Sequence, residues 1–61
     1  MKAKVGDRIR IVRMNGEPHY TGKVGVVLTI GKDCDGDEFL RGTWGGLSVY
    51  PKTDEIEIIN N

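Results

Sequence analysis

The stretch of the sequence with the densest chemical groups is an acidic run. Asp33, Asp35 and Asp37 alternate along it, and Glu38 follows directly. Carboxylates at the first, third and fifth positions are typical of a calcium-binding loop, but an EF-hand also needs glycine at the sixth position and a bidentate glutamate at the twelfth. Those two positions hold Glu38 and Trp44. The run therefore predicts a solvated hairpin tip and no metal site.

Cys34 and His19 are the remaining side chains that could act as a nucleophile or a base. Cys34 lies among the carboxylates, whereas a reactive cysteine needs an electropositive neighbourhood. His19 is the only histidine, and no serine or cysteine that it could activate lies near it in the sequence. The glycines match no phosphate-binding pattern. The sequence thus predicts no catalytic residue, no cofactor and a protein that is not an enzyme.

Aromatic side chains give the first of two binding hypotheses. His19, Tyr20 and Tyr50 could line a surface for a protein partner, because aromatic rings supply many of the anchoring contacts in such interfaces. Small barrels also present loops and exposed strand edges to peptides and partner proteins. We favour this hypothesis, a non-enzymatic protein-interaction module whose partner the sequence does not name.

Basic side chains give the second hypothesis, a nucleic-acid-binding domain that uses the basic first strand. Lysine and arginine would contact phosphates while a tyrosine stacks on bases, as in single-strand binders. The basic residues concerned are Arg8, Arg10, Arg13, Lys23 and Arg41. The formal net charge of zero and the isoelectric point near 6.5 weigh against this hypothesis, because nucleic-acid-binding domains are usually more basic.

The basic residues also have an internal explanation. Residues 1–24 carry six basic and two acidic side chains, and residues 25–61 carry three basic and seven acidic ones. If the last strand lies antiparallel beside the first, Arg8 and Arg10 stand across from glutamates. Those glutamates are Glu55 and Glu57, and such pairs stabilise a sheet by ~0.2 to 1 kcal/mol each. Internal pairing and a binding surface both remain open on the sequence alone.

The strand that would carry most of these basic residues is predicted from alternation. We expect a strand at 7–14, in which Arg8, Ile9, Arg10 and Ile11 alternate polar and apolar side chains and so turn Ile9 and Ile11 inward. An Asn-Gly pair and a proline then break regular structure. We therefore expect a loop at 15–22.

The central strand is predicted at 20–30, because this segment is nearly all apolar and rich in β-branched residues. Gly25 within it marks a bend or a close backbone approach. After an Asp-Gly turn and a Gly-Gly turn, further strands are expected at 39–44, 47–50 and 55–58. We expect Ile56 and Ile58 to point into the core; we expect Trp44 there too, with Phe39 as the alternative to it.

Five short strands in 61 residues predict one small domain that spans 1–61. A chain of this length buries only ~60% of its unfolded surface. An open five-stranded sheet would leave one apolar face wet, so a closed arrangement is expected. The predicted fold class is all-β, a small five-stranded barrel that can form one short helical turn at 51–54.

The order of these segments resembles Src-homology-3-like barrels of the KOW type. The residues that carry this likeness are Val5-Gly6-Asp7-Arg8-Ile9-Arg10-Ile11 and Thr21-Gly22-Lys23-Val24-Gly25-Val26-Val27 with Ile30. Most of the chain also resembles a family of short uncharacterised proteins of phages and mobile elements of Gram-positive bacteria. That likeness rests on Gly6–Arg10, Gly25–Val27, Gly42–Gly46, Pro51 and Asp54–Ile59. It implies the barrel fold and a phage or mobile-element origin, and it brings no assigned activity.

Cysteine content and hydropathy indicate the cellular compartment in which the protein is expected. A single cysteine excludes an intrachain disulfide and favours a reducing interior. The sequence has no apolar run of the length that a signal peptide or a membrane span requires. We therefore expect a protein of the bacterial host cytoplasm with no membrane partner. Because the core is small, homodimerisation is a further hypothesis.

Overall fold

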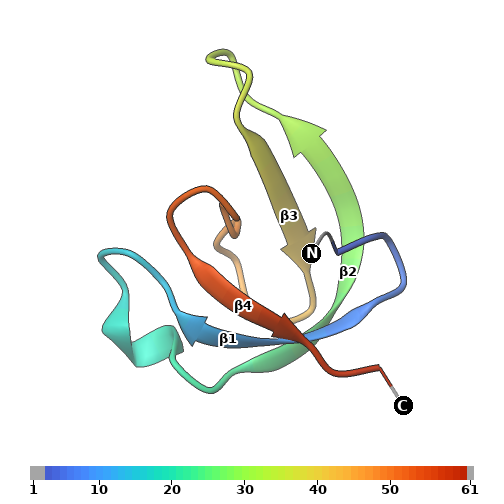
Figure 1. The fold of residues 1–61 in the computed structure, drawn as a ribbon, viewed down its shortest axis with the longest axis vertical. Coiled ribbons are helices and arrows are strands. Elements are labelled where there is room, and N and C mark those ends of the chain that lie inside the picture. The colour runs from blue at the N-terminus through green and yellow to red at the C-terminus, as the bar shows by residue number, and fades with distance from the viewer. Residues whose placement is uncertain (1–2, 61) are drawn as a thin grey trace.

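The computed structural model describes residues 3–60, which form an antiparallel sheet without an α-helix (Figure 1). The elements are the strands β1 (Arg8–Arg13), β2 (Val24–Lys32), β3 (Glu38–Gly42) and β4 (Glu55–Ile58), and one 3-10 turn, η1 (Pro18–Tyr20). The order across the sheet is β3-β2-β1-β4. The all-β class predicted from the sequence is confirmed. No helix in this part of the chain is long and apolar enough to cross a membrane.

The long strand β2 belongs to both halves of the fold. Its first residues pair with β1, and its later residues, from Val27 onward, pair with β3. A register shift between Val27 and Thr29 leaves Leu28 without a partner in β3, and such a β-bulge bends a strand. In Figure 1 the β2–β3 hairpin accordingly rises away from β1 and β4. One curved strand thus folds the sheet over a core.

Two glycines let Trp44 lie against this bend. A Cβ at Gly25 would lie 2.7 Å from the Trp44 backbone nitrogen. A Cβ at Gly42 would collide with the Val26 carbonyl oxygen and with the Trp44 ring. The indole is only 4% exposed, and its Nε1 donates a hydrogen bond to the Leu47 carbonyl oxygen over 2.9 Å. The close approach predicted at Gly25 and the core position of Trp44 are both confirmed.

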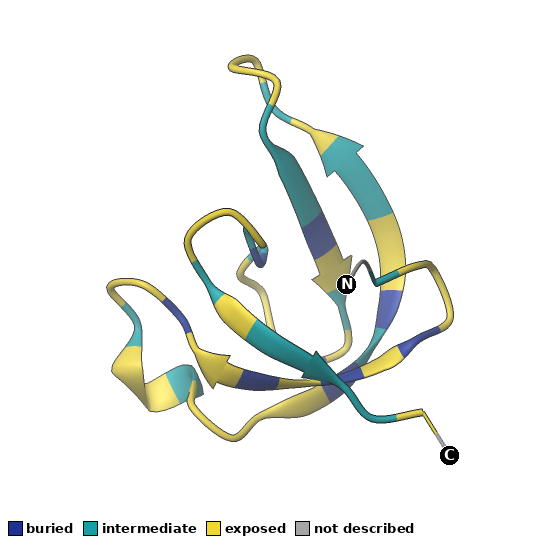
Figure 2. Ribbon diagram, viewed as in Figure 1, coloured by how far each residue is buried: buried dark blue, intermediate teal, exposed yellow. Residues whose placement is uncertain are grey.

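The core lies between the two halves of the bent sheet (Figure 2). Ile9 and Ile11 are fully buried, as their alternation predicts. Met14 is buried too, because a register shift between Ile11 and Arg13 turns two successive residues outward and brings the next one back in. The other buried members are Val27, Leu40, Trp44 and Val49, with Ile56 and Ile58 partly buried against them.

The segment predicted as a strand at 47–50 contributes a single bridge, between Leu40 and Val49. β3 ends two residues before Trp44, and a wider loop replaces the expected tight hairpin. In this loop the Leu47 carbonyl oxygen accepts the indole N–H instead of a strand partner. The described residues therefore form four strands and one bridge, and a five-stranded closed barrel is not confirmed.

Two further boundaries follow from local hydrogen bonds. β2 begins at Val24, not at Tyr20, because Tyr20 ends η1. The Thr53 and Asp54 amides both donate to the Tyr50 carbonyl oxygen, over 2.9 and 2.7 Å. The short helical turn expected at 51–54 is therefore a hydrogen-bonded turn and not a helix.

Candidate functional site

Tyr20, one of the residues predicted to bind a partner, lies between two loops. It ends η1, which begins at Pro18, a residue whose fixed φ suits the first turn of a helix. The Gly22 amide donates to the Ile11 carbonyl oxygen over 2.7 Å and ties this loop to β1. A Cβ at Gly45 would lie 2.7 Å from the Tyr20 hydroxyl oxygen, so the ring lies directly against the second loop. Tyr20 is thus held in place while it stays partly exposed.

His19 and Lys23 flank the Tyr20 ring. The His19 and Tyr20 ring centroids are 5.2 Å apart at an interplanar angle of 61°, an edge-to-face arrangement. The Lys23 Nζ lies 5.4 Å from the Tyr20 ring centroid, within the range of a cation–π contact. The His19 Nε2 also lies 3.3 Å from Glu17 Oε1. We call His19, Tyr20 and Lys23 the Tyr20 cluster.

Tyr50, the third residue predicted for the partner surface, belongs to a different aromatic pair. Its ring centroid lies 6.0 Å from that of Phe39, at an angle of 50°. The Phe39 ring in turn covers Gly31, where a Cβ would lie 2.8 Å from its Cζ. Among residues 3–60, no ring contact joins Tyr50 to His19 or Tyr20. The structure brings His19 and Tyr20 together and gives Tyr50 a separate partner.

The antiparallel pairing of the first and last strands is confirmed, and it engages basic side chains of β1. Arg10 lies opposite Glu57, with its Nε 2.6 Å from Oε1. Arg13 lies opposite Glu55, with its Nε 3.9 Å from Oε1. All four side chains are about half exposed or more, so each pair stabilises the fold by only ~0 to 1 kcal/mol. Internal pairing therefore accounts for two of the basic residues.

Arg8 does not face a glutamate, contrary to the prediction. Because β1 and β4 run antiparallel, the chain opposite Arg8 has already passed the end of β4. The Ile59 amide donates to the Arg8 carbonyl oxygen over 2.8 Å, and the Arg8 amide donates to Asn60 Oδ1 over 2.6 Å. At the other end of β1, the bulge brings Arg13 to the first glutamate of β4.

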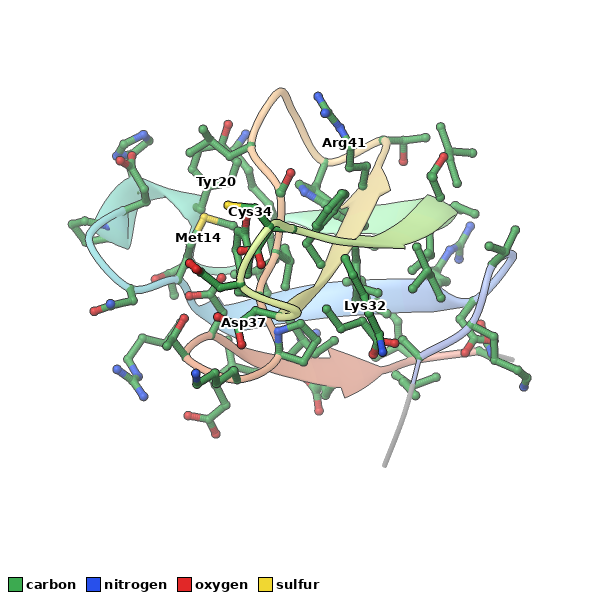
Figure 3. The ribbon with its side chains drawn as sticks, turned by 90° about the horizontal axis from the view of Figure 1, so that it is seen from above. Met14, Tyr20, Lys32, Cys34, Asp37 and Arg41 are labelled. Carbon is green, nitrogen blue, oxygen red and sulfur yellow. The ribbon has the colours of Figure 1, made fainter. Side chains whose placement is uncertain are left out.

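The five basic residues of the nucleic-acid hypothesis have different local contacts. Arg10 and Arg13 pair with β4, and Lys23 belongs to the Tyr20 cluster. Arg41 is on β3, at the opposite edge of the sheet from β4. In Figure 3 its side chain projects on the side of the molecule away from β4. Arg41 therefore lies apart from the basic residues of β1.

Asp33 organises the hairpin tip between β2 and β3. Its Oδ1 accepts hydrogen bonds from the Asp35 and Asp37 amides, over 2.9 and 3.0 Å. Each of these three aspartates has an oxygen within 4.8 Å of the others, and Lys52 Nζ lies 3.3 Å from Asp37 Oδ1. Cys34 is exposed at the same tip, as Figure 3 shows. Carboxylate oxygens are the ligands of hard cations, but hydrogen bonding within the turn already explains this spacing.

Asp54 has a role that sequence reasoning missed. Its Oδ1 accepts the Asn15 amide and its Oδ2 accepts the Tyr50 amide, each over 2.9 Å. The carboxylate thereby holds the loop after β1 against the turn before β4. An aspartate shortly after a proline signals a turn, but Asn15 lies 39 positions away, beyond the reach of any local pattern.

Asp7 is a second carboxylate that the sequence did not single out. Its Oδ2 accepts the Lys4 amide over 2.9 Å, and its Oδ1 accepts Nδ2 of Asn60 over 2.7 Å. The hydrogen bond from the Lys4 backbone, and then that from Asn60, hold the pKa of the Asp7 carboxyl below its usual 3.8. Asp7 is 7% exposed, and it joins the segment before β1 to the segment after β4.

A cavity of about 200 Å³ lies between the two edge strands of the sheet, β3 and β4. Its lining residues are Ala3, Glu38, Leu40, Pro51, Asp54, Glu55 and Ile56. The lining combines four apolar residues with three carboxylates. None of these residues was predicted as a site residue, because they come from both ends and the middle of the sequence.

Comparisons with known proteins add no relative to this description. No protein-family model matches the chain, and no curated protein or solved structure is significantly similar to it. The resemblance to Src-homology-3-like barrels and to the phage and mobile-element family stays a prediction. Function has to be inferred from the side chains themselves.

Proposed function

We propose that this chain is a non-enzymatic protein-interaction module built on a small Src-homology-3-like barrel. The observation that carries the proposal is the Tyr20 cluster. It combines an aromatic ring that is held by backbone contacts with an exposed imidazole and an exposed ammonium group. A tyrosine in such a position offers a large contact area at a low cost in side-chain entropy, which is why tyrosine is frequent in binding surfaces.

Three features of the sheet support the barrel. The first and last strands are antiparallel neighbours, and β2 is shared between the two halves. The bridge between Leu40 and Val49 lies where a fifth strand would pair with β3. If the chain has the phage or mobile-element origin that the sequence implies, its partner is a protein of the bacterial host cytoplasm.

The nucleic-acid alternative has less support. Arg10 and Arg13 are partly neutralised by the glutamates opposite them, and Arg41 lies at the other edge of the sheet. Phosphate binding gains its strength from several cations that act together on one backbone. The same experiment tests both functions.

Affinity capture with the tagged full chain tests the proposal, with a bacterial host lysate split into nuclease-treated and untreated halves. We expect one discrete protein that survives nuclease and high salt. Tyr20→Ala should weaken its binding roughly 30-fold, the ~2 kcal/mol typical of an interface anchor. Recovery of nucleic acid, with bound proteins lost on nuclease treatment and binding lost on charge reversal at Arg10 and Arg13, would contradict the proposal.

Because Tyr20 is partly buried, matched variants must separate binding from folding. Tyr20→Phe keeps the ring against Gly45, and His19→Ala changes only an exposed side chain of the cluster. Tyr50→Ala tests the other aromatic pair. The stability of each variant is first compared with that of the native chain by urea unfolding, with Trp44 fluorescence as the signal. Full capture by folded His19→Ala and Tyr20→Ala variants would show that the cluster is not the binding surface.

A further inference from the structure

The cavity between β3 and β4 lies where the sheet does not close. The strand order leaves β3 and β4 as the two edges, and among residues 3–60 the outer side of β3 has the bridge between Leu40 and Val49 but no full strand. Glu38 and Leu40 reach the cavity from β3, and Glu55 and Ile56 reach it from β4. The two edges of one sheet therefore contribute the same kinds of side chain, one acidic and one apolar each.

The apolar part of the lining continues the core. Leu40 is 1% exposed, and Ile56 packs against the buried cluster. Pro51 and Ala3 complete the apolar surface. A ligand that enters the cavity would therefore bury some apolar surface of its own.

The polar part of the lining carries a single sign of charge. Three carboxylates, those of Glu38, Asp54 and Glu55, line the cavity, and the lining found among residues 3–60 includes no basic residue. The Asp54 carboxylate is fixed in place by the Asn15 and Tyr50 amides. The Glu55 side chain is 62% exposed and forms an exposed ion pair with Arg13, whose Nε lies 3.9 Å from its oxygen, and such a pair is weak enough to be exchanged for another cation. Charge complementarity therefore favours a cation.

The volume decides what kind of cation fits. At about 200 Å³ the cavity is smaller than the ~300 to 1,000 Å³ of typical small-molecule and cofactor sites. One long side chain fits such a space better than a folded element does. Arginine and lysine combine an aliphatic stem, which packs on apolar surface, with a charged head that stays near polar groups.

We propose that this cavity binds one arginine or lysine side chain from an extended segment of a partner protein. The stem lies on Leu40 and Ile56, and the charged head faces the carboxylates of Glu38 and Glu55. The outer edge of β4 has no strand partner within 3–60, so the main chain of the segment can pair along it. This inference rests on the proposed function, since it describes one contact of the same interaction module at a site other than the Tyr20 cluster.

A titration with a synthetic peptide tests the inference. The probe is a short, capped, otherwise uncharged peptide with one central arginine, and its matched control carries the neutral isostere citrulline. The ¹⁵N-labelled full chain is followed by NMR. We expect saturable shifts at the Leu40, Glu55 and Ile56 amides, with binding of the citrulline peptide about tenfold weaker or more, as expected for loss of a charge-assisted contact.

Variants locate the binding within the chain. Glu55→Gln and Glu38→Gln should each weaken the arginine peptide several-fold. Asp35→Asn removes one negative charge from the hairpin tip, away from the cavity lining, and should leave binding unchanged. Comparable weakening by Asp35→Asn, or NMR shifts spread over the hairpin tip, would mean that the peptide binds by non-specific charge attraction, and this would overturn the inference.

Two more outcomes separate this inference from the proposed function. If the peptide does not bind but a Tyr20-dependent partner is captured, the inference fails while the proposed function stands. If the cavity amides shift on dilution of the protein alone, with a matching change in mass, the occupant is a second copy of the chain and the inference of a partner segment is overturned. Peptide binding at the cavity that is unchanged in Tyr20→Phe supports the inference.

Discussion

At the scale of single residues, two carboxylates hold separate segments of the chain together, which the exposed ion pairs do to a much smaller extent. Asp54 and Asp7 each accept hydrogen bonds through both oxygens, from donors on segments far apart in the sequence. The acceptors fix the backbone amides of Asn15, Tyr50 and Lys4, whereas the two side chains of an exposed pair such as Arg10 with Glu57 remain largely solvated whether or not they pair. Removal of a paired acceptor should cost more than removal of an exposed charge.

Asp54→Asn should destabilise the fold by ~1 to 3 kcal/mol. Asparagine offers one acceptor oxygen, so its NH₂ group would face either the Asn15 or the Tyr50 amide, donor against donor. The free energy of unfolding in urea measures the change. Asp35→Asn, which alters charge equally at the exposed tip, is the control, and equal effects of the two variants would refute this role of Asp54.

Asp7 should make stability depend on pH in the acid range. Its hydrogen bonds hold the folded pKa below the usual 3.8, so its contribution is complete above that value and is lost as the pH falls through the folded pKa. Asp7→Asn should therefore lose stability at about pH 7, and the gap to the native chain should narrow towards about pH 3. Urea unfolding at several pH values measures this gap, and a constant gap would exclude the linkage.

At the scale of elements, backbone spacing around Trp44 fixes where the sheet bends. The indole lies on Gly25 and Gly42, and the bulge at Leu28 turns β2 towards β3. Side chains at those glycines would push the two halves of the sheet apart. The shape of the fold thus depends on the absence of side chains at Gly25 and Gly42 as much as on the apolar residues of the core.

Gly42→Ala should destabilise the protein by ~1 to 3 kcal/mol or more, as overpacking of a dense interior does. The added methyl group would meet the Val26 carbonyl oxygen and the Trp44 ring. Gly46→Ala is the matched control, because its Cβ would meet nothing within 4 Å. Both are measured by thermal unfolding with Trp44 fluorescence, and a neutral Gly42→Ala would mean that the bend can relax.

The sequence predicted those elements whose pattern is local. Alternation over Arg8–Ile11 located β1 with its inward side chains Ile9 and Ile11, strict alternation located β4, and the apolar run located most of β2. The two bulges could not be predicted, because an extra residue in a strand leaves no mark in the sequence pattern. The bulge in β1 buries Met14 and places Arg13 opposite a glutamate, and the bulge in β2 bends that strand. The contact between His19 and Tyr20 could be expected because they are neighbours in the sequence, whereas the cavity could not, because its lining residues lie far apart in the sequence.

At the scale of the whole molecule, one core joins all four strands. Buried residues come from β1, β2 and β3, and the isoleucines of β4 pack against them. No strand has a hydrophobic cluster of its own. Cooperative behaviour is expected of a domain so organised.

Unfolding in urea should therefore be a single transition, with a free energy of only ~3 to 5 kcal/mol for so small a core. Trp44 fluorescence reports on the core, and far-ultraviolet circular dichroism reports on the strands. The two curves should coincide at every protein concentration tested. Separate midpoints would mean that the β2–β3 hairpin unfolds independently of β1 and β4.

The pairing of β1 with β4 also determines how the molecule responds to mechanical force. Arg8, at the start of β1, bonds to Asn60, just beyond β4, so both points of attachment lie at the same end of an antiparallel pair. Tension applied at these two residues loads the interstrand hydrogen bonds one after another, like a zipper, and not all together in shear. A single-molecule pulling experiment should accordingly find low rupture forces from this direction and higher ones when the chain is held at Arg8 and at the opposite end of β4.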